Sequence, residues 1–282
     1  MLKAIEKLKE FNINLSEIVN EYIESNETKI TDNKLYYKNI PEGLFLLSHN
    51  KRILSLNNRF KNFGTMLDLA RGAVFKVSYI KELIYKQALM GVNQIWLYIE
   101  DVFELEDYPT FGYFRGKYTN EEIKEIVEFS LIFGVELIPS IQVLGHHEQF
   151  LKWPNSLEYR DQDKVLLVEN EKTNNLIEAM LKWCKLLFKT NKIHIGMDES
   201  FGLGFGNYYK QNGYKKPLDI FIDHLISVNK LAIDMGFNEV MIWSDMFFRF
   251  YSETDYYYDT TIKLPEELVN KIPNNVSLVY WD

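Results

Sequence analysis

The amino-acid sequence predicts an α/β protein in which a repeated βα unit builds a (β/α)8 barrel of the TIM type, with six of the eight units in this chain. Three observations lead to this prediction. A helix, a glycine and a strand follow one another at three joints, the predicted strands are apolar along their length, and the strands end at polar or aromatic side chains. Apolar strands of this kind are buried on both faces, as in a parallel sheet covered by helices.

The three joints share the order glycine, apolar residue, polar residue. They begin at Gly91, Gly134 and Gly236, and each leads into an apolar run. A glycine after the last helical turn supplies the left-handed backbone that ends a helix, and a short apolar run is typical of a strand in a parallel sheet. The joints therefore predict a βα repeat.

Six strands are expected in order, near residues 65–70, 94–99, 136–141, 193–197, 239–243 and 276–281. The segments between them carry helix signals. Thr119 and Glu122 form a capping-box pattern, and Pro217 suits a first helical turn. The segment NNLIEAMLKWCKLLF is apolar at helical spacing and holds the single cysteine, Cys184, which we expect in the core.

A series of βα units forms either a doubly wound sheet or a barrel. The first βα turn lacks the glycine-rich phosphate sequence of a nucleotide-binding doubly wound fold. In a barrel, all strand ends open on one face, where barrel active sites are built. The predicted strands end at Asp68 and Arg71, Glu100 and Asp101, Gln142 and His146, Asp198 and Glu199, Trp243 and Asp245, and Trp281 and Asp282. This convergence of functional residue types favours the barrel.

Residues 1–60 show helical and hairpin-like patterns without the βα repeat, so we expect a small N-terminal element packed on a barrel of residues 61–282. The sequence ends at SLVYWD, after the sixth strand, and we expect a barrel truncated at its C-terminus. An unpaired strand edge invites pairing. Association of copies through this open edge is therefore expected.

Composition excludes several classes of protein. The formal net charge is −8 and no basic stripe is present, which argues against a nucleic-acid partner. No run is long and apolar enough to span a membrane, and the charged, amphipathic N-terminus does not resemble a signal peptide, so a cytoplasmic location is expected. A single cysteine excludes an internal disulfide framework and a four-cysteine zinc site.

Adjacent carboxylates in HIGMDES, Asp198 and Glu199, set a geometric problem. Side chains on a strand alternate between its faces, so both can enter a barrel only where the strand ends and turns. The following GLGFG gives the backbone that freedom, and we expect it to be a flexible loop.

Together with MLDLARG, IWLYIED, IPSIQVLGHHE and MIWSDMF, HIGMDES resembles glycoside hydrolase family 20, the β-N-acetylhexosaminidases. The resemblance runs from about residue 64 to the end. The family more often has glycine at the position of Met197, and the HIGMDE form resembles a branch without the usual N-terminal accessory domain.

This resemblance implies an exo-acting enzyme that removes terminal β-linked GlcNAc or GalNAc from a glycan, without a metal or a cofactor. The 2-acetamido oxygen of the substrate acts as the nucleophile and forms an oxazolinium ion, so configuration is retained. By resemblance, Glu199 protonates the departing oxygen and then activates water. Asp198 orients the acetamido N–H and stabilises the positive charge that develops on it.

Three further residues carry over by resemblance. Arg71 matches the arginine that holds the sugar hydroxyls, with a salt bridge to a barrel carboxylate such as Asp68 as the alternative. Asp101 and His146 match a pair that supports the catalytic acid, in which the aspartate fixes the histidine tautomer. A structural histidine is the alternative for His146.

Trp243 and Trp281 match the aromatic walls of the acetamido pocket, and core packing is the alternative for both. Two other functions stay open at this point. One is a non-catalytic carbohydrate-binding or remnant barrel. The other is a metal-dependent hydrolase using His147 and Glu148 with Asp198, although their spacing matches no known ligand set.

Overall fold

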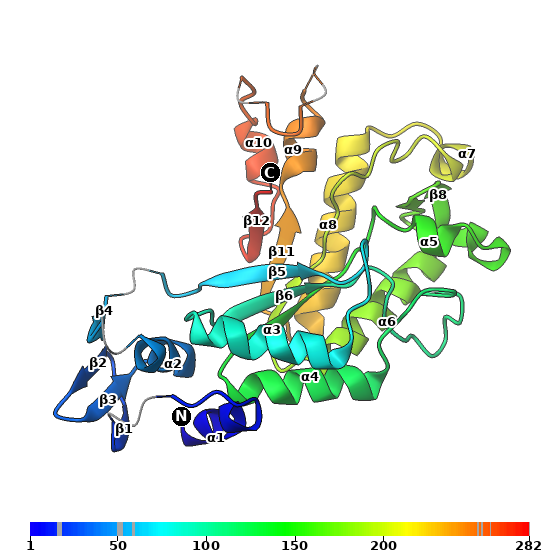
Figure 1. Ribbon diagram of the computed structural model, residues 1–282. Coiled ribbons are helices and arrows are strands. Elements are labelled where there is room, and N and C mark those ends of the chain that lie inside the picture. The colour runs from blue at the N-terminus through cyan, green and yellow to red at the C-terminus, as the bar shows by residue number, and fades with distance from the viewer. Residues whose placement is uncertain are drawn as a thin grey trace. The chain divides into compact units, whose positions relative to one another are not determined.

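The computed structural model describes residues 1–15, 19–49, 53–57, 60–252, 254, 256–259 and 261–281 (Figure 1). Asp282, expected at the end of the sixth strand, lies outside the described residues. The strands are β1 (Glu21–Glu24), β2 (Thr28–Thr31), β3 (Lys34–Tyr37), β4 (Ser55–Leu56), β5 (Gly64–Asp68), β6 (Gln94–Tyr98), β7 (Glu136–Ser140), β8 (Arg160–Gln162), β9 (Val165–Leu166), β10 (Lys192–His194), β11 (Glu239–Trp243) and β12 (Val276–Val279).

Helices connect these strands. They are α1 (Leu2–Glu10), α2 (Ile40–Ser48), α3 (Val77–Leu89), α4 (Asn120–Ile132), α5 (Glu148–Leu151), the 3-10 helix η1 (Pro154–Tyr159), α6 (Glu171–Leu187), α7 (Asn207–Asn212), α8 (Pro217–Asp234), α9 (Asp245–Arg249) and α10 (Glu266–Val269). All six predicted strands are confirmed, as β5, β6, β7, β10, β11 and β12.

Strand order decides between the two candidate α/β folds. The large sheet has the order β12-β11-β10-β7-β6-β5, so strands that follow one another along the chain are neighbours throughout. The pairings of β7 with β10, β10 with β11 and β11 with β12 are all parallel. A doubly wound sheet would reverse its order at a switch point. The fold is therefore α/β, with six strands in the order of an incomplete (β/α)8 barrel.

The glycine, proline and apolar-stripe signals behind this fold are confirmed, whereas the capping box of Thr119 and Glu122 stays a prediction. Gly91, Gly134 and Gly236 have φ angles of 84°, 66° and 88°, in the left-handed region that a helix C-terminus requires. Helix α8 begins at Pro217, where the missing N–H of proline has no helical partner to lose. The apolar stripe of α6 is buried and includes Cys184.

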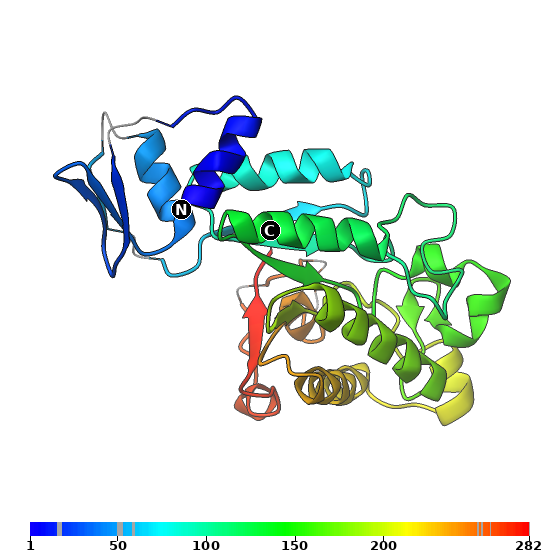
Figure 2. The same cartoon turned by 90° about the horizontal axis from the view of Figure 1, so that it is seen from below.

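The chain divides into two compact units. The first comprises residues 1–68, 75–97 and 120–138. It contains a second sheet of order β1-β3-β2-β4, against which α2 packs, and α3 lies beside α4 (Figure 2). The helical pattern of the N-terminal sequence is confirmed by α1 and α2. The hairpin-like interpretation of LFLLSHNKRILSL is wrong in its first half, which belongs to helix α2 as far as Ser48, and among its described residues only Ser55–Leu56 form a strand. The division of the chain at residue 60 stays a prediction.

The second unit comprises residues 69–74, 98–119 and 139–282. It contains β10, β11, β12, the antiparallel hairpin β8–β9 and the packed helices α6 and α8. Every predicted site residue lies in this unit, so their mutual geometry belongs to one compact body. In the described part of the chain, no helix is both long and apolar enough to cross a bilayer.

Candidate active site

A sharp turn after β10 brings the adjacent carboxylates to one place. The strand was expected to continue to residue 197, but it ends at His194. Gly196, Met197 and Glu199 then adopt φ angles of 69°, 74° and 45°. Left-handed backbone at non-glycine residues is costly and persists where the surroundings enforce it. These rotations break the strand alternation that would have separated Asp198 from Glu199.

Asp198 is held on both carboxylate oxygens. Its Oδ1 accepts a hydrogen bond of 2.7 Å from Gln142 Nε2, and its Oδ2 lies 3.0 Å from His146 Nε2. Burial alone would raise the pKa of Asp198, but the hydrogen bonds and charge of His146, with the Gln142 amide, lower it below its usual value. Asp198 is therefore a buried and ionised carboxylate.

His146 stands between the two carboxylates. Its Nε2 lies 3.6 Å from Glu199 Oε2 as well as 3.0 Å from Asp198. Burial favours the neutral ring, but the hydrogen bond and negative charge of Asp198 outweigh it and raise the pKa of His146. When it is protonated, His146 compensates the negative charge of Asp198 and Glu199.

Glu199 has a different environment from its neighbour. Its side chain is 23% exposed, against 10% for Asp198. Glu199 Oε1 accepts a 2.5 Å hydrogen bond from the Tyr257 hydroxyl, and Oε2 lies 3.8 Å from Lys164 Nζ. The hydrogen bond to Glu199, followed by burial, raises the pKa of Tyr257 to about 12, so the hydroxyl stays a donor.

An amide and a phenol connect Asp198 to Arg71. Gln142 Nε2 also donates to the Tyr98 hydroxyl at 3.0 Å, and that hydroxyl donates to Glu100 Oε1 at 2.9 Å. The Arg71 guanidinium lies 4.9 Å from the centre of the Tyr98 ring, a cation–π distance. The oxygen of the Gln142 amide accepts from Met197 N–H, which supports the turn.

Asp101 and His146 do not form the expected pair in this structure. Asp101 Oδ1 instead accepts a 2.6 Å hydrogen bond from Arg115 Nη1, while His146 faces Asp198. Arg115 also donates to the carbonyl of Ala70 and lies 3.7 Å from Glu100 Oε2. Burial raises the pKa values of both acids, and the Arg115 charge opposes the rise. Arg115 is thus the cation that pairs with the two adjacent buried carboxylates, Glu100 and Asp101.

Replacing Arg115 with methionine leaves these two carboxylates without their cation. We expect the free energy of unfolding to fall by about 3–5 kcal/mol, because removing one partner of a buried ion pair leaves an uncompensated charge. Urea unfolding at pH 7 measures it. Lys86→Met, which removes a cation from the exposed pair with Glu82, should have a far smaller effect because solvent screens an exposed ion pair. Equal effects of the two substitutions would contradict the structural role of Arg115.

A polar cavity of about 500 Å³ lies on the Arg71 side of the site. Its lining includes Arg71, Arg115, Glu100, Glu148 and the backbone of residues 70–74. Cations and carboxylates side by side provide both donors and acceptors, which is what a ring of sugar hydroxyls requires.

The two predicted wall tryptophans are half-buried and contact polar aromatic partners. The Trp243 ring lies 4.3 Å from the His194 ring, and the Trp281 ring lies 4.8 Å from that of Tyr257. Burial lowers the pKa of His194 to about 4, so this ring is neutral. Trp281 therefore contacts the residue that donates to Glu199.

Comparison with known proteins bears on this arrangement. The profile described as "Glycosyl hydrolase family 20, catalytic domain" matches residues 60–256, more than half of the chain. The chain belongs to glycosyl hydrolase family 20. The resemblance seen in HIGMDES and its companion motifs is thereby confirmed.

Curated family 20 relatives include bovine (Bos taurus) hexosaminidase D, 27% identical over 223 residues, which are 77% of this chain and 61% of the bovine protein. Human (Homo sapiens) hexosaminidase D is 31% identical over 144 residues, 50% of this chain and 29% of that protein. This chain thus spans about three fifths or less of these relatives' length.

A solved family 20 structure shares the fold. The exo β-N-acetylglucosaminidase from Vibrio harveyi, in complex with N-acetylglucosamine, superposes with a TM-score of 0.73 at 17% identity. The match covers 99% of this chain and 52% of that one. At this identity it supports the barrel fold alone.

The GLGFG segment of this family 20 chain is anchored rather than free, contrary to expectation. Asp161, on the hairpin β8–β9, accepts hydrogen bonds from Gly204 N–H at 2.7 Å and Tyr208 N–H at 2.8 Å. Asp161 and Leu203 are both buried. The loop after Glu199 is therefore fixed to the hairpin that carries Lys164.

The residues considered for a metal are arranged differently from a ligand set. His147 is buried, its Nε2 lies 3.0 Å from the Gln142 carbonyl, and burial lowers its pKa to about 3. Glu148 is exposed. Among the described residues, no three or more His, Cys, Asp or Glu side chains are grouped to hold an ion.

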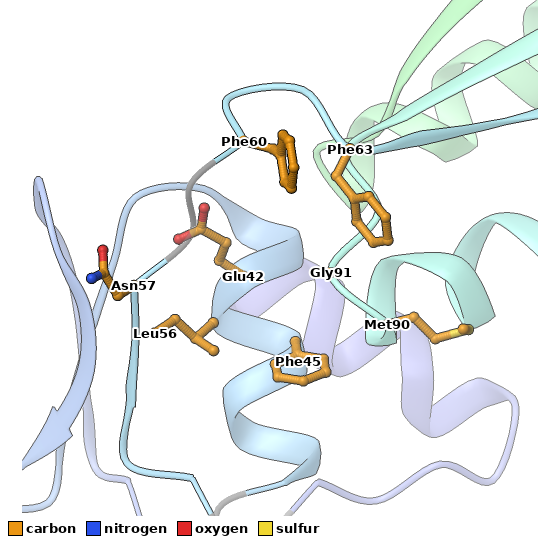
Figure 3. A pocket seen from close by; sticks show the side chains of 8 residues that line it. All are labelled: Glu42, Phe45, Leu56, Asn57, Phe60, Phe63, Met90 and Gly91. Carbon is orange, nitrogen blue, oxygen red and sulfur yellow. The ribbon is translucent and has the colours of Figure 1, made fainter.

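A second pocket of about 290 Å³ lies in the first unit, formed by α2, the segment after β4 and the end of α3 (Figure 3). It is lined by Glu42, Phe45, Leu56, Asn57, Phe60, Phe63, Met90 and Gly91. None of the predicted site residues is among them, and the lining is mainly apolar.

Several residues of the family 20 site received no role from the sequence. Gln142 and Asp245 were visible as polar strand ends, which was the available signal. Arg115, Lys164 and Tyr257 come from irregular segments or a short hairpin, where no periodic pattern marks a residue as part of a site.

Proposed function

We propose that this chain carries the active site of an exo-acting β-N-acetylhexosaminidase, which hydrolyses terminal β-linked GlcNAc or GalNAc with retention of configuration. One observation carries the proposal. Two adjacent carboxylates share a turn, yet Asp198 is buried and held on both oxygens while Glu199 is partly exposed. Substrate-assisted hydrolysis by family 20 needs this division of labour.

In this proposal Asp198 remains ionised throughout the reaction. Its lowered pKa keeps it anionic, and its hydrogen bonds to Gln142 and His146 prevent it from turning away. A fixed negative charge beside the 2-acetamido group orients the N–H, so that the carbonyl oxygen attacks the anomeric carbon. It also stabilises the oxazolinium ion, because the charge is already in place when the cation forms.

Glu199 transfers protons in this proposal. It donates a proton to the departing glycosidic oxygen. The resulting carboxylate then accepts a proton from the water that attacks the anomeric carbon and opens the oxazolinium ring. Tyr257 and Lys164 contact the two oxygens of its carboxylate. Arg71, beside the polar cavity, would hold the sugar hydroxyls, and Trp243 and Trp281 would enclose the acetamido methyl group.

The substrates are glycans with a terminal N-acetylhexosamine. We further propose that copies associate through the edge of the large sheet at β12, because unpaired strand edges invite pairing.

The acetamido group tests the proposal directly. We expect nitrophenyl β-GlcNAc or β-GalNAc to be cleaved with kcat/KM at least about 10³-fold above nitrophenyl β-glucoside, because an intramolecular nucleophile has a very high effective concentration. Steady-state release of nitrophenol measures it.

Two controls separate the other candidate functions. A chelator should leave the rate unchanged, whereas a metal-dependent hydrolase would lose activity. Binding of GlcNAc without turnover of any glycoside would support a non-catalytic carbohydrate-binding protein. Equal cleavage of the glucoside would contradict the substrate-assisted mechanism.

A further inference from the structure

Asp245 is a fully buried residue that contacts the backbone of Glu199, the proposed acid. It follows β11 and begins the short helix α9, and its exposed fraction is 0%. Its Oδ2 accepts a 3.2 Å hydrogen bond from the backbone N–H of Glu199. Glu199 has a φ of 45°, and this left-handed backbone allows its carboxylate and that of Asp198 to lie in one turn. Asp245 therefore binds the backbone at the turn itself.

A second contact of Asp245 involves Trp281. Among the described residues, Asp245 Oδ1 and Trp281 Nε1 are both buried without a full hydrogen bond. One is an acceptor and the other a donor, and the indole N–H lies near enough to lower the pKa of Asp245. The Glu199 N–H and the Trp281 indole are thus two donors from other residues that act on this carboxyl.

This placement is unfavourable for stability. Burial, followed by the negative charge of Asp198, raises the pKa of Asp245 to about 6, against the opposing effect of the Glu199 N–H. The hydroxyls of Tyr257 and Tyr258 are the other titratable groups that feel its charge. A neutral side chain of the same shape would avoid the cost of burying this charge. Residues retained against stability are frequently retained for function.

We propose that Asp245 is a positioning residue, whose carboxylate holds the left-handed backbone of Glu199 and orients the indole of Trp281 from one buried point. The roles of Glu199 and Trp281 rest on the proposed function. The hydrogen bond to the Glu199 backbone is independent of it.

Asp245→Asn tests the proposal, because the asparagine amide has one acceptor oxygen and a donor NH2 group, so it cannot accept from both the Glu199 N–H and the Trp281 indole. We expect kcat for nitrophenyl β-GlcNAc to fall by about 10- to 100-fold with little change in KM, since a displacement of about 1 Å can cost 10²-fold. The melting temperature at pH 7 should stay equal or rise. Glu42→Gln, at a buried carboxyl of the first unit, is the matched control and should leave kcat unchanged.

The pH dependence of stability supplies a second readout. Because the folded pKa of about 6 exceeds the ordinary value of 3.8, the folded state binds more protons between these values, and its stability falls as pH rises through this window. The difference in melting temperature between Asp245→Asn and the wild type should therefore grow from pH 4 to pH 7. A lower melting temperature in Asp245→Asn, with a proportional loss of activity, would indicate a merely structural residue and overturn the proposal.

A third readout needs no turnover. The backbone amide of Glu199 should show a chemical-shift titration near pH 6 in the wild type, and this titration should be lost in Asp245→Asn. If the wild type cleaves no hexosaminide but the titration is present, the proposed function fails while the positioning contact stands. If the Glu199 amide titrates identically in both proteins, the positioning proposal is wrong.

Discussion

Replacing Glu199 with glutamine should lower the proposed turnover most strongly for substrates whose leaving group needs a proton. Glutamine has nearly the same shape and can still accept the hydrogen bond from Tyr257, but it cannot donate a proton. General acid catalysis contributes about 10²–10⁴-fold, so kcat/KM for an alkyl or sugar leaving group should fall by about that factor. For an activated aryl leaving group the loss in the first step should be much smaller. A series of aryl β-GlcNAc substrates measures the difference as a steeper dependence of rate on leaving-group pKa.

The control for this substitution is Glu128→Gln, an exposed glutamate of α4 in the first unit. It should leave the whole series unchanged. A uniform loss in Glu199→Gln for every leaving group would assign Glu199 to charge stabilisation and not to proton transfer.

Replacing Asp198 with asparagine should cost about 10²–10³-fold in kcat for every leaving group, which is typical of losing one electrostatic stabiliser of a transition state. The substitution keeps the shape but removes the charge that would face the oxazolinium ion. It also removes the main cause of the raised pKa of His146, which should therefore titrate at lower pH. Histidine chemical shifts measure this effect without any substrate.

The lowered pKa of Asp198 also predicts how the stability of the wild type depends on pH. The pKa of Asp198 is lowered in the folded state, so its contribution to stability is present above the unfolded pKa and is lost as pH falls through the folded one. Asp198→Asn should remove this part of the acid-induced loss. Asp234→Asn, at the exposed end of α8, should retain it. A leaving-group-dependent loss of rate in Asp198→Asn would contradict the assigned role.

The sheet could be predicted because its information is local. A strand buried on both faces must be apolar along its length, and a helix that returns to such a sheet needs a left-handed residue at its end. Gly91, Gly134 and Gly236 provide that residue. The order of strands then follows from repetition of one unit, and the identity of strand ends predicts which residues meet at one face.

The turn after β10 could not be predicted in detail. The apolar pattern continues through Ile195 to Met197, so a strand to residue 197 was the natural expectation. The left-handed backbone at Met197 and Glu199 depends on partners distant in sequence, among them Gln142 and Asp245. A local pattern does not contain these partners.

Pairing among charged residues was the least predictable feature. Asp101 could accept from either His146 or a cation elsewhere, and the irregular segment between β6 and α4 supplies Arg115. Tyr257 shows the same limit. It lies in an irregular segment after α9, where no sequence pattern indicated a role for it. Its contact with Glu199 depends on the tertiary structure.

The anchoring of residues 201–206 on the hairpin β8–β9 has a consequence for how the proposed activity would be lost on heating. Asp161 accepts N–H groups from both Gly204 and Tyr208, so the loop can leave only if both bonds break and a buried carboxylate is exposed. Hairpin and loop therefore open as one cooperative unit, whose free energy of opening is below that of global unfolding. Glu199 lies at one end of this unit and Lys164 lies within it. A molecule in which the unit opens would therefore lose the arrangement of its proposed acid. The lifetime of the proposed activity on heating would then depend on the opening of this segment as well as on global unfolding.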